Sequence, residues 1–81
     1  MDPGPLLDRV LDDEGLTTGL EAADAELLLR TLADRVRSIA AKATDAATAR
    51  RRVEAVCRRA RTLVATDDGR PFRERLGDLP G

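Results

Sequence analysis

The stretch AAKATDAATARRRVEAVCRR, residues 40–59, poses the main structural question of this sequence: a helix either turns back within 42–45 or runs straight through. It lies in a 49-residue segment, 20–68, that contains neither glycine nor proline. This segment consists largely of alanine, leucine, arginine and glutamate, which are strong helix formers. Helix is therefore expected on both sides of the join.

The apolar residues follow a heptad pattern on each side of the join, but the two patterns are out of step. They are Ala22, Ala25, Leu29, Leu32, Val36, Ile39 and Ala43 before it, and Ala46, Ala49, Val53, Val56, Ala60 and Leu63 after it. A continuous heptad would place Arg50 in the core. Thr44 or Asp45 is a good N-cap for a second helix, and Lys42 suits the end of the first. We therefore expect a helical hairpin; the alternative is one continuous helix that dimerises as an antiparallel coiled coil.

The flanking segments predict a short helix at each end of this hairpin. Leucine and valine recur at helical spacing before Gly15, and Pro71 stands where a helix tolerates proline, at its start. The predicted helices cover residues 5–14, 20–43, 45–67 and 71–76. We expect a single small all-α domain over 1–81: an antiparallel helical hairpin with a coiled-coil-like seam, within a three- to four-helix bundle. A chain of 81 residues buries limited apolar surface, which favours regular packing or oligomerisation.

The inventory of reactive side chains argues against an enzyme. The chain has no histidine, tyrosine or tryptophan, and its one cysteine is Cys57. We interpret Cys57 as a small packing residue; the alternative is a redox-sensing thiol, because nearby arginines can lower a thiol pKa. The acidic run 12–14 lacks the spaced oxygen ligands of a calcium loop and is interpreted as a solvated helix end. We expect no metal, no cofactor and no small-molecule substrate.

The sequence contains no signal for a membrane or for secretion. No run approaches the ~20 apolar residues that span a bilayer, and the start MDPGPLLDRV is acidic rather than basic. A single cysteine is typical of a reducing compartment. We therefore expect a cytoplasmic location and no membrane partner.

Charge is distributed unevenly along the chain. Residues 1–29 carry eight acids and one arginine, net −7, whereas residues 30–81 carry thirteen bases and seven acids, net +6. Such asymmetry predicts that one part packs on the other or on a second copy. Opposite the predicted seam of the second long helix lie Arg50, Arg51, Arg58 and Arg61. This face is either solvated and ion-paired to the acidic half, or binds an acidic protein, or follows nucleic-acid phosphates.

A second apolar patch lies at the start of the first long helix, where Leu20 and Leu27 point away from the seam and Leu28 flanks them. It either receives the N-terminal helix and the tail around Phe72, or it forms an interaction surface. We expect a non-enzymatic protein–protein interaction or adaptor module that forms a homodimer or binds a protein partner. The residues expected to carry this contact are Leu20, Leu27, Leu28, Arg51, Arg58 and Arg61. The alternatives are a small nucleic-acid-binding protein that uses the arginine-rich face, and an accessory helical domain of a larger protein.

Overall fold

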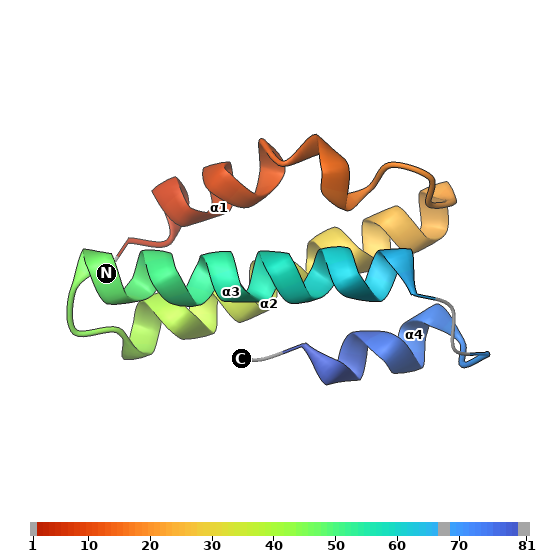
Figure 1. Ribbon diagram of the computed structural model, residues 1–81. Helices are drawn as coiled ribbons and strands as arrows, with labels where there is room; N and C mark the ends of the chain where they lie inside the picture. The colour runs from red at the N-terminus through yellow and green to blue at the C-terminus, as the bar shows by residue number, and fades with distance from the viewer. Residues whose placement is uncertain (1, 67–68, 80–81) are drawn as a thin grey trace.

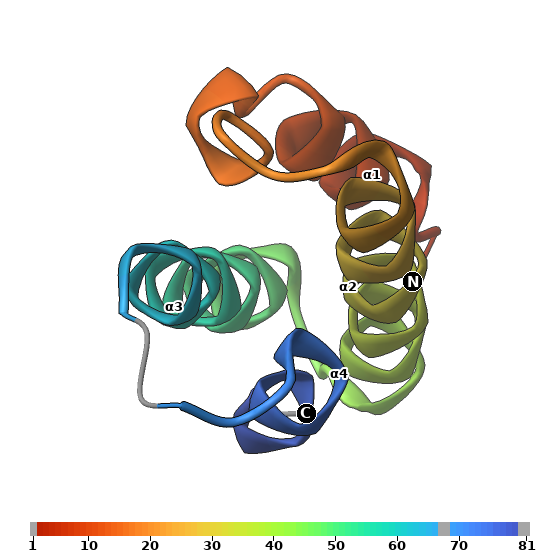
Figure 2. The same ribbon diagram turned by 90° about the vertical axis from the view of Figure 1, so that its right-hand side faces the viewer.

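The computed structural model describes residues 2–66 and 69–79 and shows an all-α arrangement (Figure 1). The elements in chain order are α1 (Gly4–Leu11), the 3-10 helix η1 (Glu14–Leu16), α2 (Ala22–Lys42), α3 (Ala46–Ala65), α4 (Phe72–Arg75) and the 3-10 helix η2 (Leu76–Asp78). Successive α-helices alternate in direction, so that α1 and α3 run one way and α2 and α4 the other. Seen end-on, α2 and α3 lie side by side, with α1 on one side of this pair and α4 on the other (Figure 2). The predicted hairpin with a short helix at each end is confirmed, and the continuous helix is wrong.

The side chain of Asp45 caps the start of α3 at the hairpin turn. The chain leaves α2 at Ala43, whose backbone is extended, and enters α3 at Ala46. Asp45 is the N-cap: its carboxylate accepts hydrogen bonds from the Thr48 backbone N–H at 2.7 Å and from the Thr48 hydroxyl at 3.1 Å. These bonds satisfy a backbone donor that would otherwise lack a partner. They also hold the pKa of the Asp45 carboxyl below its ordinary value.

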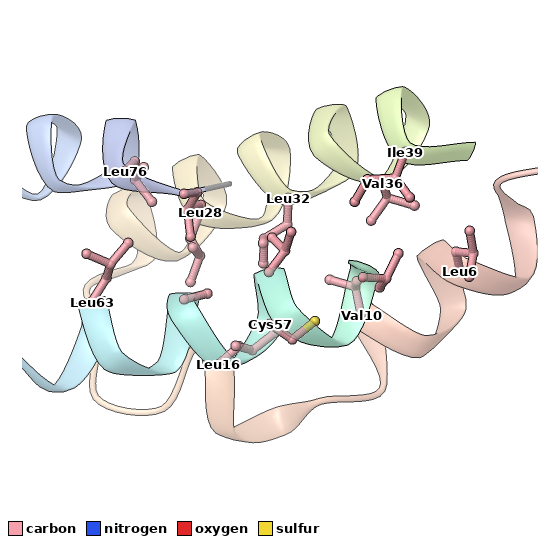
Figure 3. Packing of buried hydrophobic residues seen from close by; sticks show 14 of the residues in the cluster. Leu6, Val10, Leu16, Leu28, Leu32, Val36, Ile39, Cys57, Leu63 and Leu76 are labelled. Carbon is pink, nitrogen blue, oxygen red and sulfur yellow. The ribbon is translucent and has the colours of Figure 1, made fainter. Parts of the chain in front are cut away.

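One apolar core joins all the described elements (Figure 3). Its buried members are Leu6, Val10, Leu16, Leu28, Leu32, Val36, Ile39, Ala40, Ala49, Val53, Val56, Cys57, Ala60, Leu63, Phe72, Leu76 and Leu79. The inward residues of α3 are those of the predicted seam, except that Ala46 is exposed and Cys57 joins them.

The inward face of α2 differs from the predicted seam near its start. Leu28 is fully buried, whereas Leu29 is half-buried and Ala22 is exposed. Because α2 also packs against α1 and α4, its buried face is wider than a two-helix seam requires and includes Leu28.

The first predicted helix ends early. We expected helix over 5–14, but α1 ends at Leu11 and Gly15 lies inside η1. This 3-10 helix turns Leu16 into the core, where it has no exposed surface. Gly19 then adopts a left-handed φ of 85°, which favours glycine because it has no Cβ, and α2 begins at Ala22.

The C-terminal segment is anchored on the end of α3. The Arg75 guanidinium donates hydrogen bonds to the Leu63 carbonyl at 2.8 Å and to the Thr66 carbonyl, in the last turn of a helix where carbonyls lack partners within the helix. Arg75 also lies 5.3 Å above the centre of the Phe72 ring, a cation–π distance. The helix predicted over 45–67 corresponds to α3, which ends at Ala65. Its predicted last residue, 67, lies outside the described residues.

No helix in the described ranges is both long and apolar enough to cross a membrane.

Candidate interaction surface

The outer side of α3 carries five exposed arginines, here called the arginine face: Arg50, Arg51, Arg52, Arg58 and Arg59. Within residues 2–66 and 69–79, none of the five forms an ion pair. Arg51 makes one long hydrogen bond, 3.4 Å, to the Thr48 hydroxyl. The single acid of α3 is Glu54. The helix therefore presents an excess of positive charge. The interpretation that the acidic half of the chain pairs with the predicted arginines is confirmed for Arg61 alone among the described residues, and not for Arg50, Arg51 or Arg58.

The arginine face has a regular shape. Arg51 with Arg58 forms one row and Arg52 with Arg59 forms the other, each pair seven residues or about 10.5 Å apart along the helix. Small residues lie between the rows, so that Thr48, Arg51, Arg52 and Ala55 line an open hollow. The surface is thus a shallow trough with a small-residue floor and cationic walls.

Arg61 does not belong to this surface. Its guanidinium donates a hydrogen bond to the carboxylate of Asp13, which also lies 3.9 Å from the Arg9 guanidinium. The Asp13 side chain is only 8% exposed, so the interpretation of the acidic run as a solvated helix end is wrong at this residue. The pair ties the segment after α1 to α3, and it leaves Arg51 and Arg58 as the predicted arginines that remain open to a partner.

The three leucines of the predicted apolar patch lie in different environments. Leu28 is inside the core (Figure 3) and is not available to another molecule in this fold, because α2 is covered by α1, α3 and α4. Leu20 and Leu27 are half-buried and pack against the core. Leu27 also lines an open hollow with Arg73 from α4. The chain itself therefore covers most of this patch.

The exposed apolar residue lies elsewhere. Among the described residues Leu11 is the large hydrophobic side chain left exposed, at 63%. It shares the outer face of α1 with Asp8 and Asp12, which are also exposed, because residues three and four apart are neighbours on a helix. Helical spacing alone did not reveal this exposure, since Leu11 adjoins the buried Val10 in sequence. The two carboxylates beside it are the only local signal of a face turned to solvent.

Cys57 is buried in the core, and this burial raises the pKa of its thiol. Arg9 and Arg61 act in the opposite sense but more weakly. Because the thiolate is the reactive form, this environment favours the packing role over redox sensing. In the parts of the chain that the structure describes, no cluster of three cysteine or carboxylate side chains could hold a metal ion.

Comparison of the chain with protein-family models, with curated proteins and with solved structures gives no significant match. The fold places the chain in a broad class, small all-α proteins of alternating helices built on a hairpin of two long ones. A functional proposal therefore has to come from the surface geometry.

Proposed function

We propose that this protein is a non-enzymatic protein–protein interaction module of the cytoplasm that binds an acidic surface through the arginine face of α3. One observation carries the proposal, namely five exposed arginines on a single helix without an ion-pair partner in the described chain. None of the five forms an ion pair that would stabilise the described fold, whereas the carboxylates of an acidic partner would pair with them.

A protein partner is favoured over single-stranded nucleic acid because the one aromatic residue is not exposed. Binding of single strands uses exposed aromatic rings on which bases stack, and the one aromatic residue, Phe72, is buried beneath Arg75.

The test is a comparison of two charge-reversed proteins. Binding of a fluorescein-labelled peptide of glutamate and alanine, and of random duplex DNA, is measured by fluorescence anisotropy at low and near-physiological salt. Arg51→Glu with Arg58→Glu removes part of the arginine face. Arg30→Glu with Arg37→Glu makes the same change in net charge on α2 and is the matched control.

We expect the α3 variant to bind the peptide about tenfold more weakly, which corresponds to ~1.4 kcal/mol, and the α2 variant to bind nearly as the parent does. Equal losses in the two variants would mean that net charge alone governs binding and would contradict the proposal. Tighter binding of the duplex than of the peptide, with a steep salt dependence, would replace it with the nucleic-acid alternative.

A further inference from the structure

We infer that the acidic segment of the partner binds in an extended form along the groove between α1 and α3, with its carboxylates on Arg50 and Arg58. The inference rests on the proposed function, and it specifies which side of the arginine face is used and how the acids of the partner are spaced. The groove, here called the α1–α3 groove, consists of two neighbouring hollows that share Arg9 from α1. Arg50 lines one hollow beside Leu6, and Arg58 lines the other beside Cys57.

The α1–α3 groove already binds one carboxylate, which belongs to the chain itself. Asp13 accepts a hydrogen bond from Arg61, which lines the same hollow as Arg58, and it lies 3.9 Å from the Arg9 guanidinium. The Asp13 side chain is only 8% exposed, so guanidinium groups from two helices meet on one sheltered carboxylate. Farther along the groove, Arg50 and Arg58 form no ion pair with any described residue. Carboxylates of a partner can therefore bind there in the same way.

The charge balance of the groove favours an acidic ligand. The arginines that border it are Arg9, Arg50, Arg58 and Arg61. They are opposed by two carboxylates, Glu54 and Asp13, which leaves an excess of two positive charges. The apolar side chains of Leu6 and Cys57 lie in the same hollows and reduce the contact of a bound carboxylate with water, which strengthens its attraction to the guanidinium groups. The hollow on the far side of α3 is lined by α3 alone and offers no such shelter.

The spacing of the two open arginines fits an extended peptide. Arg50 and Arg58 are eight residues apart, or about 12 Å along the helix axis. In an extended chain, residues four apart are about 13 Å apart and point to the same side. Glu54 lies midway between the two arginines and would repel an acid at the central position of the peptide. We therefore expect a segment with two acids four residues apart and an uncharged residue midway between them.

The size of the hollows also favours an extended segment. Their volumes are ≈ 170 Å³ and ≈ 300 Å³, at or below the lower end of the range of about 300–1,000 Å³ that is typical of small-molecule pockets. Each hollow therefore suits a side chain rather than a whole small-molecule ligand. An extended backbone is thinner than a helix of about 10–12 Å diameter, so it can approach closely enough for both carboxylates to enter.

A comparison of two peptides tests the spacing. Both are fluorescein-labelled chains of threonine, serine and glutamate with the same composition, and their binding to the parent protein is measured by fluorescence anisotropy at low salt. One peptide has glutamate at every fourth position, and the other has the same number of glutamates in adjacent pairs. The spaced peptide should bind about fivefold more tightly, because only one glutamate of each adjacent pair can point into the groove.

Charge reversal at Arg9 tests the contribution of α1. Arg9→Glu should weaken binding of the spaced peptide about tenfold, and Arg9→Lys, which keeps the charge, should weaken it less. Arg30→Glu makes the same change in net charge on α2 and should bind nearly as the parent does. Circular dichroism checks that each variant is folded.

Two double variants compare the two sides of α3. Arg50→Glu with Arg58→Glu changes the side that borders α1 and should weaken binding of the spaced peptide about tenfold. Arg52→Glu with Arg59→Glu makes the same change in net charge on the side away from α1 and should weaken binding only about threefold, through the loss of general attraction.

Equal affinities of the parent for the two peptides would overturn the extended segment, and equal losses in the two double variants would overturn the choice of groove. In both cases the proposed function stands if charge reversal on α3 weakens peptide binding more than charge reversal on α2. If neither peptide binds at about 1 mM, both proposals fall. Light scattering of the parent tests the remaining occupant: a dimer that the spaced peptide dissociates would place a second copy of this chain in the groove and overturn a separate partner.

Discussion

The two long helices lie side by side and have similar lengths, yet their outer faces differ in charge balance. On α2 the Arg30 guanidinium lies 2.9 Å from the Glu26 carboxylate, and that of Arg37 lies 3.3 Å from Asp34. These partners are four and three residues apart, the spacing at which a helix pairs its own side chains. On α3 six arginines share one acid, Glu54. A face with alternating signs is neutralised by its own helix, whereas on α3 a single acid leaves most of the arginines without a counter-charge on the same helix.

The inner faces of the same helices differ in size. The buried residues of α2 include Leu28, Leu32 and Ile39, whereas α3 contributes Ala49 and Ala60 among its buried residues. Small residues let two helix axes approach, so large side chains of one helix fill the space left by small ones of the other. The side chains of α2 therefore supply a large part of the apolar contact across the hairpin.

The largest expected effect tests which leucine of α2 faces the core. Leu28→Ala should lower the free energy of unfolding by ~2–5 kcal/mol, because it empties a fully buried site. Leu29→Ala is the matched control and should cost less than half as much, since Leu29 is half-buried. Urea denaturation measures both. Equal losses in the free energy of unfolding would mean that Leu29 faces the core as much as Leu28 does, as the strict heptad pattern predicts.

An intermediate effect is expected at the turn between the two helices. Asp45→Ala removes the acceptor of two hydrogen bonds at the start of α3 and should lower the urea midpoint, by less than Leu28→Ala does. The Asp45 pKa is depressed in the folded state below its ordinary value of 3.8. Its contribution is therefore present above that value and is lost as the pH falls through the lower pKa of the folded state.

The pH dependence supplies the control for this prediction. The difference in midpoint between the parent and Asp45→Ala should be constant near neutral pH and should shrink in acid. A difference that persists unchanged at a pH well below the folded pKa would show that the carboxylate is not the stabilising group.

The smallest expected effect concerns the outer faces. Arg30→Gln breaks an ion pair within α2 and should cost ~0.3–0.5 kcal/mol at low salt. Arg58→Gln removes a charge without a partner in the described chain and should leave stability unchanged or raise it slightly. Urea denaturation of both variants in low and high salt checks this. Salt screens exposed charges, so the difference in stability between the two variants should shrink at high salt. A larger loss for Arg58→Gln would mean that the arginine face contributes to the fold.

Much of the architecture could be predicted because its signals lie between near neighbours. Asp45 accepts a hydrogen bond from a residue three positions away, and the inward residues of α3 repeat at helical spacing. Both features can therefore be recognised from residues that are close in the sequence. The positions of Arg51 and Arg58 on the outer face follow from the same periodicity. The absence of histidine, tyrosine and tryptophan is equally a property of composition.

Contacts between distant segments could not be predicted. The Asp13–Arg61 pair joins residues 48 positions apart, Arg75 reaches the carbonyl of Leu63 from another helix, and Leu11 is exposed although its neighbour Val10 is buried. Each depends on how α1 and α4 dock on the hairpin, which is set by the combined packing of side chains from several helices. Local pattern specifies where helices begin and which way they face. Which charges pair and which leucines are buried depends on how the helices pack together, because the energy of burial depends on all the surfaces in contact.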